Sequence, residues 1–288
     1  MSESGWSMKF WGVRGSFPCP GAATVRYGGH TPCVSLEGPG PSLILDAGSG
    51  LHGCGRALLE REEGAGTVDV VLTHTHWDHI IGLPYFEPLY QEGWTVRVHG
   101  PRPETRPLRE VIDALWDPSV FPAFPVADLQ VKELGDDEFA LAGWRIRSYG
   151  MHHPGRTLGY RLERPGVRPV AYLTDNELER PEEPADSQWR VGLVDFLHGV
   201  GTLVHDTMFT DAELETRHGW GHSSPDAAVR LAAEAGCREL FLFHHDVAKD
   251  DVAMDAVVRS TRLFAAGVAP ELSVDPTIEG TTLGLEDS

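Results

Sequence analysis

Residues 73–79, with the sequence THTHWDH, place three imidazoles and a carboxylate within six positions. They directly follow the apolar run 68–72, which predicts a buried strand. Imidazole and charged groups crowded away from water are costly unless something pairs them. A divalent cation is the simplest partner, because imidazole nitrogen and carboxylate oxygen are ligands that zinc and similar ions take. The segment therefore predicts a metal site.

The spacing of these side chains indicates two ions. His74 and His76 are two positions apart, so on an extended segment both point to one side and can hold one ion. Asp78 and His79 follow after the chain has begun to turn, and can face a second ion. The alternative is a surface loop that is histidine-rich by chance. It is disfavoured because 14 histidines in 288 residues would rarely cluster in this way.

The pattern H-x-H-x-D-H, followed by IIGLP at residues 80–84, resembles the signature of the metallo-β-lactamase superfamily of binuclear hydrolases. The resemblance implies a four-layer αββα sandwich of the α/β (α+β) class, with the metals at one end of its sheets. Flavo-di-iron oxygen reductases of this superfamily carry glutamate where His76 stands. The second histidine therefore favours hydrolysis over oxygen chemistry.

Residues 151–161 look like the third motif of the superfamily, in which a histidine stands six residues before a Gly-Tyr pair. That register selects His153 and not His152. The ordinary alternative for such a histidine is a hydrogen-bonded core or turn residue.

Two further ligands are expected at strand ends. Asp175 ends the apolar strand 170–174 and matches the bridging aspartate of the family; its alternative role is that of a turn residue. His244 and His245 both follow the strand 239–243. Because side chains on a strand alternate between faces, only one of the pair should point at the site. The resemblance favours His244.

The implied site holds two divalent metal ions. Zinc is the expected metal, although manganese and iron tolerate the same ligands. The implied ligands of one ion are His74, His76 and His153, those of the other are Asp78, His79 and His244, and Asp175 lies between the ions.

Residues 218–224, HGWGHSS, are similar to the Gly-His-Ser-Thr segment of the phosphodiesterase branch, which includes ribonuclease Z. In those relatives the histidine assists proton delivery to the leaving oxygen, a role that would fall to His222 here, beside Asp78 in the catalytic set. Asp206 would orient His222, as carboxylates orient catalytic imidazoles. The alternative for His222 is a helix-entry residue bonded to backbone.

Within that branch the chain most resembles bacterial proteins that begin with FWGVRGS, here residues 10–16, and share the RYGG segment at 26–29. These are grouped with small-molecule phosphodiesterases. His30 departs from their usual asparagine. Arg14, Arg26 and Arg156 lie in loops, where each could bind phosphate or simply brace its loop.

The expected function is metal-dependent hydrolysis of a phosphodiester bond in a small, cyclic nucleotide-like substrate. A thioester or lactone hydrolase of the same fold would not need His222 as an acid. A non-catalytic metal-bound sensing module would bind metal without turnover.

Composition limits the partners. Lys and Arg number 24 against 43 Asp and Glu, a net charge of −19, so a long nucleic acid is not expected as substrate. No apolar run approaches 18 residues, so no membrane span is expected. Four widely spaced cysteines look like isolated reduced thiols, and with no secretory signal we expect a cytoplasmic protein. We treat residues 1–288 as one domain, and a homodimer remains open.

The apolar pattern predicts two blocks of strands, each followed by helices. The expected strands are 8–13, 33–37, 42–46, 68–72, 95–99, 129–134, 139–149, 157–163, 170–174, 202–205 and 239–243. The expected helices are 51–63, 103–115, one from Ser224 to 235, and one from about 259 to 266.

Overall fold

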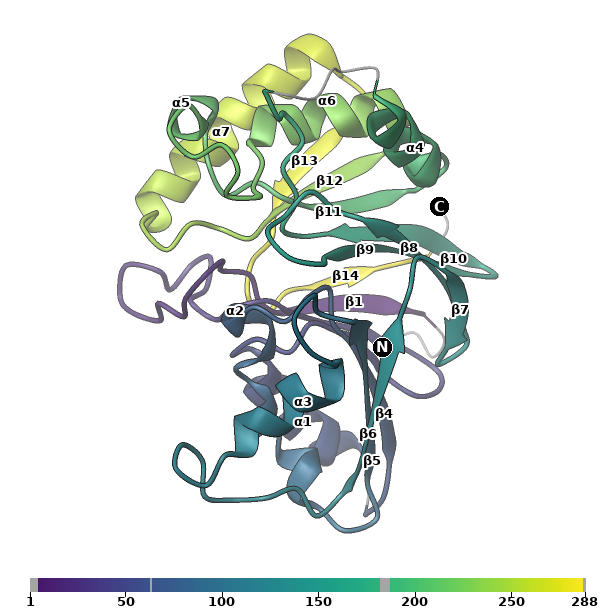
Figure 1. Ribbon diagram of the computed structural model, residues 1–288. Coiled ribbons are helices and arrows are strands. Elements are labelled where there is room, and N and C mark those ends of the chain that lie inside the picture. The colour runs from purple at the N-terminus through teal and green to yellow at the C-terminus, as the bar shows by residue number, and fades with distance from the viewer. Residues whose placement is uncertain (1–4, 63, 182–186, 287–288) are drawn as a thin grey trace.

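The computed structural model describes residues 5–62, 64–181 and 187–286. Within them the chain forms two seven-stranded mixed sheets that face each other, with helices on their outer faces (Figure 1).

The first sheet has the strand order β14-β1-β2-β3-β4-β5-β6. Strands β3 to β6 run parallel, and β14, β1, β2 and β3 pair antiparallel. Its strands are β1 (Ser7–Gly12), β2 (Cys33–Glu37), β3 (Leu43–Leu45), β4 (Thr67–Val71), β5 (Thr95–Pro101), β6 (Asp128–Leu134) and β14 (Thr282–Gly284).

The second sheet has the order β13-β12-β11-β10-β9-β8-β7. Strands β10 to β13 run parallel, and β7 to β10 pair antiparallel. Its strands are β7 (Glu138–Leu141), β8 (Trp144–Gly150), β9 (Leu158–Arg164), β10 (Val167–Leu173), β11 (Thr202–Asp206), β12 (Glu239–Phe243) and β13 (Ser273–Pro276).

Helices lie on both outer faces of the sandwich. Those in the first half are α1 (Leu51–Arg61), α2 (Trp77–Ile80) and α3 (Leu108–Asp113), with the 3-10 helices η1 (Leu83–Tyr85), η2 (Glu87–Tyr90) and η3 (Ala114–Trp116). Those in the second half are α4 (Gln188–Leu197), α5 (Asp211–Leu214), α6 (Pro225–Ala235) and α7 (Asp251–Val268). No helix in the described part of the chain is long and apolar enough to cross a membrane.

Three apolar cores separate four layers. One core lies between the sheets and includes Phe10 and Tyr172. Another joins the first sheet to α1 and α3, and the third joins the second sheet to α4, α6 and α7. Alternate side chains of a strand enter different cores, as Tyr172 and Leu173 of β10 do. The predicted αββα sandwich is confirmed.

Several boundaries differ from the sequence prediction. Residues 139–149 form two strands, because Ala142 and Gly143 both adopt left-handed backbone and close a hairpin. Helix α3 begins at Leu108 after Pro107, not at 103. Helix α7 begins at Asp251 because the Asp250 side chain accepts the backbone N–H of Ala253 as a cap, and α4, β13 and β14 were not predicted.

Cys33 and Cys54 lie in one core. Burial raises the pKa of the Cys33 thiol well above its usual range, and the neighbouring Cys54 thiol raises it further. The Cys33 thiol is therefore a neutral core group, and all four cysteines are free.

Most of the residues singled out from the sequence lie at one end of the two sheets. They follow the carboxyl ends of β4, β10, β11 and β12, and each of these strands runs parallel to a neighbour. Ligands of α/β proteins bind at this end of parallel strands. Helix α2 lies there, at the junction of the two halves (Figure 1).

Candidate metal centre

One group of ligand atoms comes from His74, His76 and His153, which offer nitrogens within 4.8 Å of one another. His74 and His76 follow β4, and His153 lies in the turn after β8. The Nε2 atom of His153 is 3.0 Å from Nδ1 of His76. The buried Nε2 of His74 makes no hydrogen bond to any described residue, although it faces this group.

A second group comes from Asp78, His79, Asp175 and His244, all buried. Oδ2 of Asp175 is 3.1 Å from Nε2 of His79 and 3.3 Å from Nε2 of His244. Oδ2 of Asp78 is 3.2 Å from each of the same two nitrogens. Four donor atoms thus converge on one small volume.

Asp175 connects the two groups. Its Oδ1 is 3.9 Å from Nε2 of His74 and 3.7 Å from Nε2 of His153, while its Oδ2 faces the second group. A carboxylate placed in this way can contact two cations, one through each oxygen. The structure therefore brings the seven residues implied by the sequence together at one place.

In each of the two pairs of adjacent histidines, only one member points into the metal centre. After β12, His244 points into the second group, whereas Nε2 of His245 is 2.9 Å from the carbonyl oxygen of Thr277. Burial lowers the pKa of His245 to about 3, so it is a neutral hydrogen-bonded core residue. In the turn after β8, His153 joins the cluster and His152 stacks on Trp189 with ring centroids 3.6 Å apart.

The charges fit divalent cations. Burial lowers the pKa of His74 well below its usual range, and the neighbouring His79 lowers it further, so His74 is in the neutral form that metal binding requires. Burial also opposes the charged form of His79, but the carboxylates of Asp78, Asp175 and Asp46 outweigh it and raise its pKa well above the usual range. Three carboxylates around one position favour a cation there.

Asp46 was not predicted from the sequence. It follows β3, is fully buried, and its Oδ2 is 2.9 Å from Nδ1 of His79 and accepts the hydroxyl of Tyr172 at 2.9 Å. Its Oδ1 accepts the backbone N–H of Thr73 at 2.8 Å. A carboxylate on the far nitrogen of a ligating histidine fixes the ring and its tautomer. The available signal was an aspartate directly after a buried strand.

Three residues of the centre have left-handed backbone, which is unusual for residues other than glycine. The φ angles are 59° at Asp46, 55° at Asp175 and 61° at His244. Such conformations persist only where the surroundings enforce them, and they gather at functional sites. Asp46 and His244 directly follow strands and Asp175 comes two residues after β10, so the sharp turn aims each side chain at the centre.

His222 lies beside both groups of ligands. Its Nδ1 is 2.7 Å from Oδ2 of Asp206, and its ring stacks on that of His244 with centroids 5.1 Å apart. Asp206 is fully buried at the end of β11. Burial alone would lower the pKa of His222, but the Asp206 carboxylate outweighs burial and raises it to about 9. The expected pairing of His222 with Asp206 is present.

Glu177 was not predicted from the sequence either. Its buried carboxylate accepts the backbone N–H groups of Gly219 and Gly221, with Oε2 at 2.9 and 3.0 Å. The carbonyl oxygen of Gly221 is 3.0 Å from Nδ1 of His153. A Cβ on Gly221 would lie 2.2 Å from that same nitrogen, so only glycine fits. Glu177 thus ties the segment before His222 to a ligand histidine.

The three loop arginines are engaged in bracing contacts. Arg14 is fully buried and donates to the carbonyl oxygens of Gly28, Asp246 and Lys249. Arg26 forms an ion pair with Asp255.

Arg156 pairs with Asp136 at 2.7 Å. Nδ1 of His30, the departure from the usual asparagine, is 3.0 Å from the hydroxyl of Ser49. The loop-bracing alternative holds for all three arginines, and His30 likewise contacts a neighbouring loop.

A four-layer sandwich with paired His/Asp ligand groups at the carboxyl ends of its strands defines a class of metal-dependent hydrolases. Residues 42–245 match the model of the beta-lactamase superfamily domain. The chain belongs to this superfamily, as the histidine motif indicated.

Ribonuclease Z proteins are among its relatives. That of Kineococcus radiotolerans is 26% identical, over 78% of this chain and 80% of the relative. That of Haloferax volcanii is 24% identical, over 81% and 84%. The predicted relationship to ribonuclease Z is therefore confirmed.

Solved structures share the fold. Yeast PDE1 superposes with a TM-score of 0.70 at 14% identity, covering 98% of this chain and 100% of that one. YhfI from Bacillus subtilis, a metallo-beta-lactamase fold protein, gives 0.68 at 18% identity, covering 97% and 99%. A diphosphatase from the PhnP family gives 0.66 at 18%, covering 98% and 100%. At these identities the likeness establishes the fold alone.

Proposed function

We propose that this protein is a binuclear metal-dependent hydrolase that cleaves a phosphodiester bond in a small, cyclic nucleotide-like substrate. The observation that carries the proposal is the contact between His222 and Asp206, at 2.7 Å, directly beside the two ligand groups. This contact supports the role of His222 as the proton donor to the departing oxygen.

The proposed ligands of one ion are His74, His76 and His153, those of the other are Asp78, His79 and His244, and Asp175 contacts both. Bound divalent cations lower the pKa of water and polarise a phosphoryl oxygen. Zinc is the metal proposed, because mixed imidazole and carboxylate donors suit it. The unbonded Nε2 of His74 and the charge pattern around His79 support this assignment.

In this proposal His222 supplies the proton and Asp206 orients His222. Asp206 accepts the Nδ1–H of His222, which leaves Nε2 as the atom that delivers a proton. An alkoxide is a strongly basic leaving group, so a positioned acid is worth about 10²–10⁴ in rate. Asp78 is held by the backbone N–H of Ser16 at 2.8 Å, which fixes the carboxylate that faces His79 and His244.

A small substrate is proposed in preference to RNA. The relatives are named ribonuclease Z, which denotes cleavage of RNA. This chain carries a net charge of −19, which repels a long phosphate backbone but still permits a small anion at a local centre of cations.

A panel of substrates tests the proposal. The purified protein, loaded with zinc or manganese and analysed for bound metal, is assayed on bis(p-nitrophenyl) phosphate, cyclic nucleotides, a short RNA, a thioester and a lactone. We expect turnover of the small phosphodiesters. Preferred turnover of RNA, or of the thioester or lactone, would replace the proposed substrate. Bound metal without turnover of any member would support the sensing module.

Replacing His222 tests the role of the acid. His222→Ala should reduce turnover of a cyclic nucleotide, whose leaving group is an alkoxide, by at least about tenfold. Turnover of bis(p-nitrophenyl) phosphate should fall much less, because p-nitrophenolate needs little protonation. Metal content should not change. An equal loss on both substrates would remove the assigned role.

A further inference from the structure

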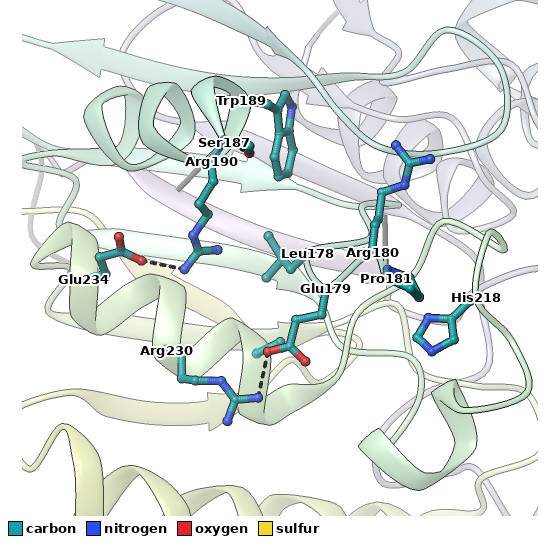
Figure 2. A pocket seen from close by; sticks show the side chains of 11 residues that line it. Leu178, Glu179, Arg180, Pro181, Ser187, Trp189, Arg190, His218, Arg230 and Glu234 are labelled. Atoms are coloured by element: carbon teal, nitrogen blue, oxygen red, sulfur yellow. Dashed lines mark hydrogen bonds and ion pairs between the residues drawn. The ribbon is translucent and has the colours of Figure 1, made fainter. Parts of the chain in front are cut away.

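Two neighbouring pockets share a lining residue, the inner one borders the metal centre, and neither was anticipated from the sequence. The inner pocket, of about 260 Å³, is lined by His153, Glu177, Arg180, Gly219 and Gly221 among others. The outer pocket, of about 500 Å³, is lined by Leu178, Arg180, Trp189, Arg190 and Arg230 among others (Figure 2). Arg180 lines both, so the two pockets meet at this side chain.

The inner pocket begins at the metal centre on the side of the proton donor. His153 belongs both to the first ligand group and to the wall of this pocket. Gly221, also in its wall, immediately precedes His222 in the chain, and the rings of His153 and His222 have centroids 5.2 Å apart. A group attached to the oxygen that His222 protonates would therefore extend into the inner pocket and, past Arg180, into the outer one.

The outer pocket has a rigid aromatic wall. Trp189 is held by a hydrogen bond from its Nε1 to the carbonyl oxygen of Gly150 at 2.8 Å, and its ring stacks on His152. Leu178 and Ala227 add apolar surface. A fixed aromatic ring beside aliphatic side chains suits a flat group such as a nucleobase.

Charged side chains surround this apolar surface. Arg190 pairs with Glu234 at 2.6 Å, and Arg230 pairs with Glu179 at 2.9 Å, as the dashed lines in Figure 2 mark. Each of these two glutamates is thus neutralised by an arginine in the wall of the outer pocket.

From these observations we propose that the paired pockets bind the nucleoside part of the substrate on the leaving-group side of the scissile bond. The inference rests on the proposed function and adds a binding site to it: the base of the nucleotide lies in the outer pocket and its phosphate lies at the metal centre. The outer pocket, of about 500 Å³, is of the size of a small-molecule site, which favours one nucleoside over a nucleic-acid strand.

Product binding tests the inference without requiring turnover. Titration calorimetry on the zinc-loaded protein compares inorganic phosphate, ribose 5-phosphate and adenosine monophosphate. Phosphate reports the metal centre alone, and the monophosphate adds the base. We expect the monophosphate to bind about tenfold more tightly than ribose 5-phosphate, the factor that one stacked base contributes. Equal binding of these two ligands would overturn the inference.

Two variants of the pocket test where the base of the nucleotide binds. Trp189→Ala should remove most of the preference for adenosine monophosphate over ribose 5-phosphate, while inorganic phosphate binds as before. Arg180→Ala, at the junction of the pockets, should weaken the binding of adenosine monophosphate several-fold and serves if the tryptophan variant does not fold. Arg109→Ala is the matched control, because this exposed arginine lies on α3 in the first half of the chain and pairs with Asp113. A preference unchanged in both pocket variants would place the base elsewhere.

The outcomes separate the two proposals. If the substrate panel shows no phosphodiester turnover but the monophosphate preference is present and depends on Trp189, the pocket binds nucleotides and the proposed reaction is wrong. If cyclic nucleotides are cleaved but the preference is absent, the reaction stands and the pocket assignment is wrong.

Discussion

Asp46 contacts both sheets and the metal centre. It accepts hydrogen bonds from Thr73, at the end of β4, and from Tyr172, on β10 of the other sheet. Its remaining contact orients His79. A single carboxylate therefore determines how one ligand ring is held and how the facing sheets meet.

Replacing Asp46 tests this orienting role. Asp46→Asn should weaken zinc binding about 10–100-fold, the usual cost of losing such a partner of a ligating histidine. The measurement is zinc titration against a competing chelator. Asp69→Asn is the control, since Asp69 is equally buried on β4 but contacts Arg97 and His99 instead of the centre. Equal losses in the two variants would show that general destabilisation is responsible.

Glu177 should act on turnover and not on metal content. Glu177→Gln removes a charged acceptor from the N–H groups of Gly219 and Gly221, and so loosens the segment that leads to His222. We expect kcat for a cyclic nucleotide to fall about tenfold, with bound zinc unchanged. Glu177→Asp should recover part of the loss.

The control is Glu110→Gln, which alters an exposed glutamate on α3. If kcat is unaffected by Glu177→Gln, the carboxylate is only a structural brace.

Residue chemistry allowed the residues of the candidate metal centre to be predicted, because imidazole and carboxylate groups spaced so densely rarely occur without a metal ion to bind. Asp46 and Glu177 could not be found in this way. Asp46 meets Tyr172 across 126 positions of sequence, and Glu177 meets Gly219 across 42. Their roles depend on tertiary contacts that local spacing does not encode.

At the scale of elements, a buried ionic group joins β4 to β5. Asp69 is 2.8 Å from both Nε of Arg97 and Nε2 of His99. Burial opposes ionisation of Asp69, but its hydrogen bonds with His99 and Arg97 outweigh burial and hold its pKa below 3.8. Ionised Asp69 therefore stabilises the folded state above that pH, and the stabilisation is lost as the pH falls through the lowered pKa.

The lowered pKa of Asp69 predicts that its contribution to stability depends on pH. Asp69→Asn should lower the free energy of unfolding by about 2–3 kcal/mol at pH 7, as expected for losing hydrogen bonds to a charged group. The difference from the native chain should shrink as the pH falls below 3.8.

Urea unfolding at several pH values measures the difference. Asp113→Asn, at an exposed pair with Arg109, should cost less than about 1 kcal/mol at every pH. A pH-independent difference at Asp69 would contradict the assignment.

Strand periodicity identified most of the elements, and the misses have local causes. The hairpin between β7 and β8 turns on Ala142, a residue with no strong preference for left-handed backbone. Helix α3 lies after a proline-rich stretch in which any of several prolines could begin a helix. The paired pockets could not be predicted, because α4, α6 and the segment after β10 come together around them only after folding.

At the scale of the whole molecule, both halves of the chain contribute to the centre. Bound metal should therefore stabilise the sandwich as a unit, and zinc at about 100 times its Kd should add about 2.7 kcal/mol. Calorimetry with and without chelator should show a lower Tm for the stripped protein and recovery when zinc is restored.

The neighbouring histidines after β12 provide matched variants for this measurement. His245→Ala should keep the zinc-dependent rise in Tm, because His245 bonds to Thr277 and points away from the centre. His244→Ala should lose most of it. The opposite result would exchange their assignments.

The left-handed turns at Asp175 and His244 have a practical consequence for engineering. Each such conformation costs of order 1–3 kcal/mol, a cost that glycine would not incur. A library screened only for resistance to heat should therefore drift toward glycine at these two positions and discard its ligands. Screens for robust variants of this protein need a simultaneous selection for chelation, or they will enrich well-folded but inert molecules.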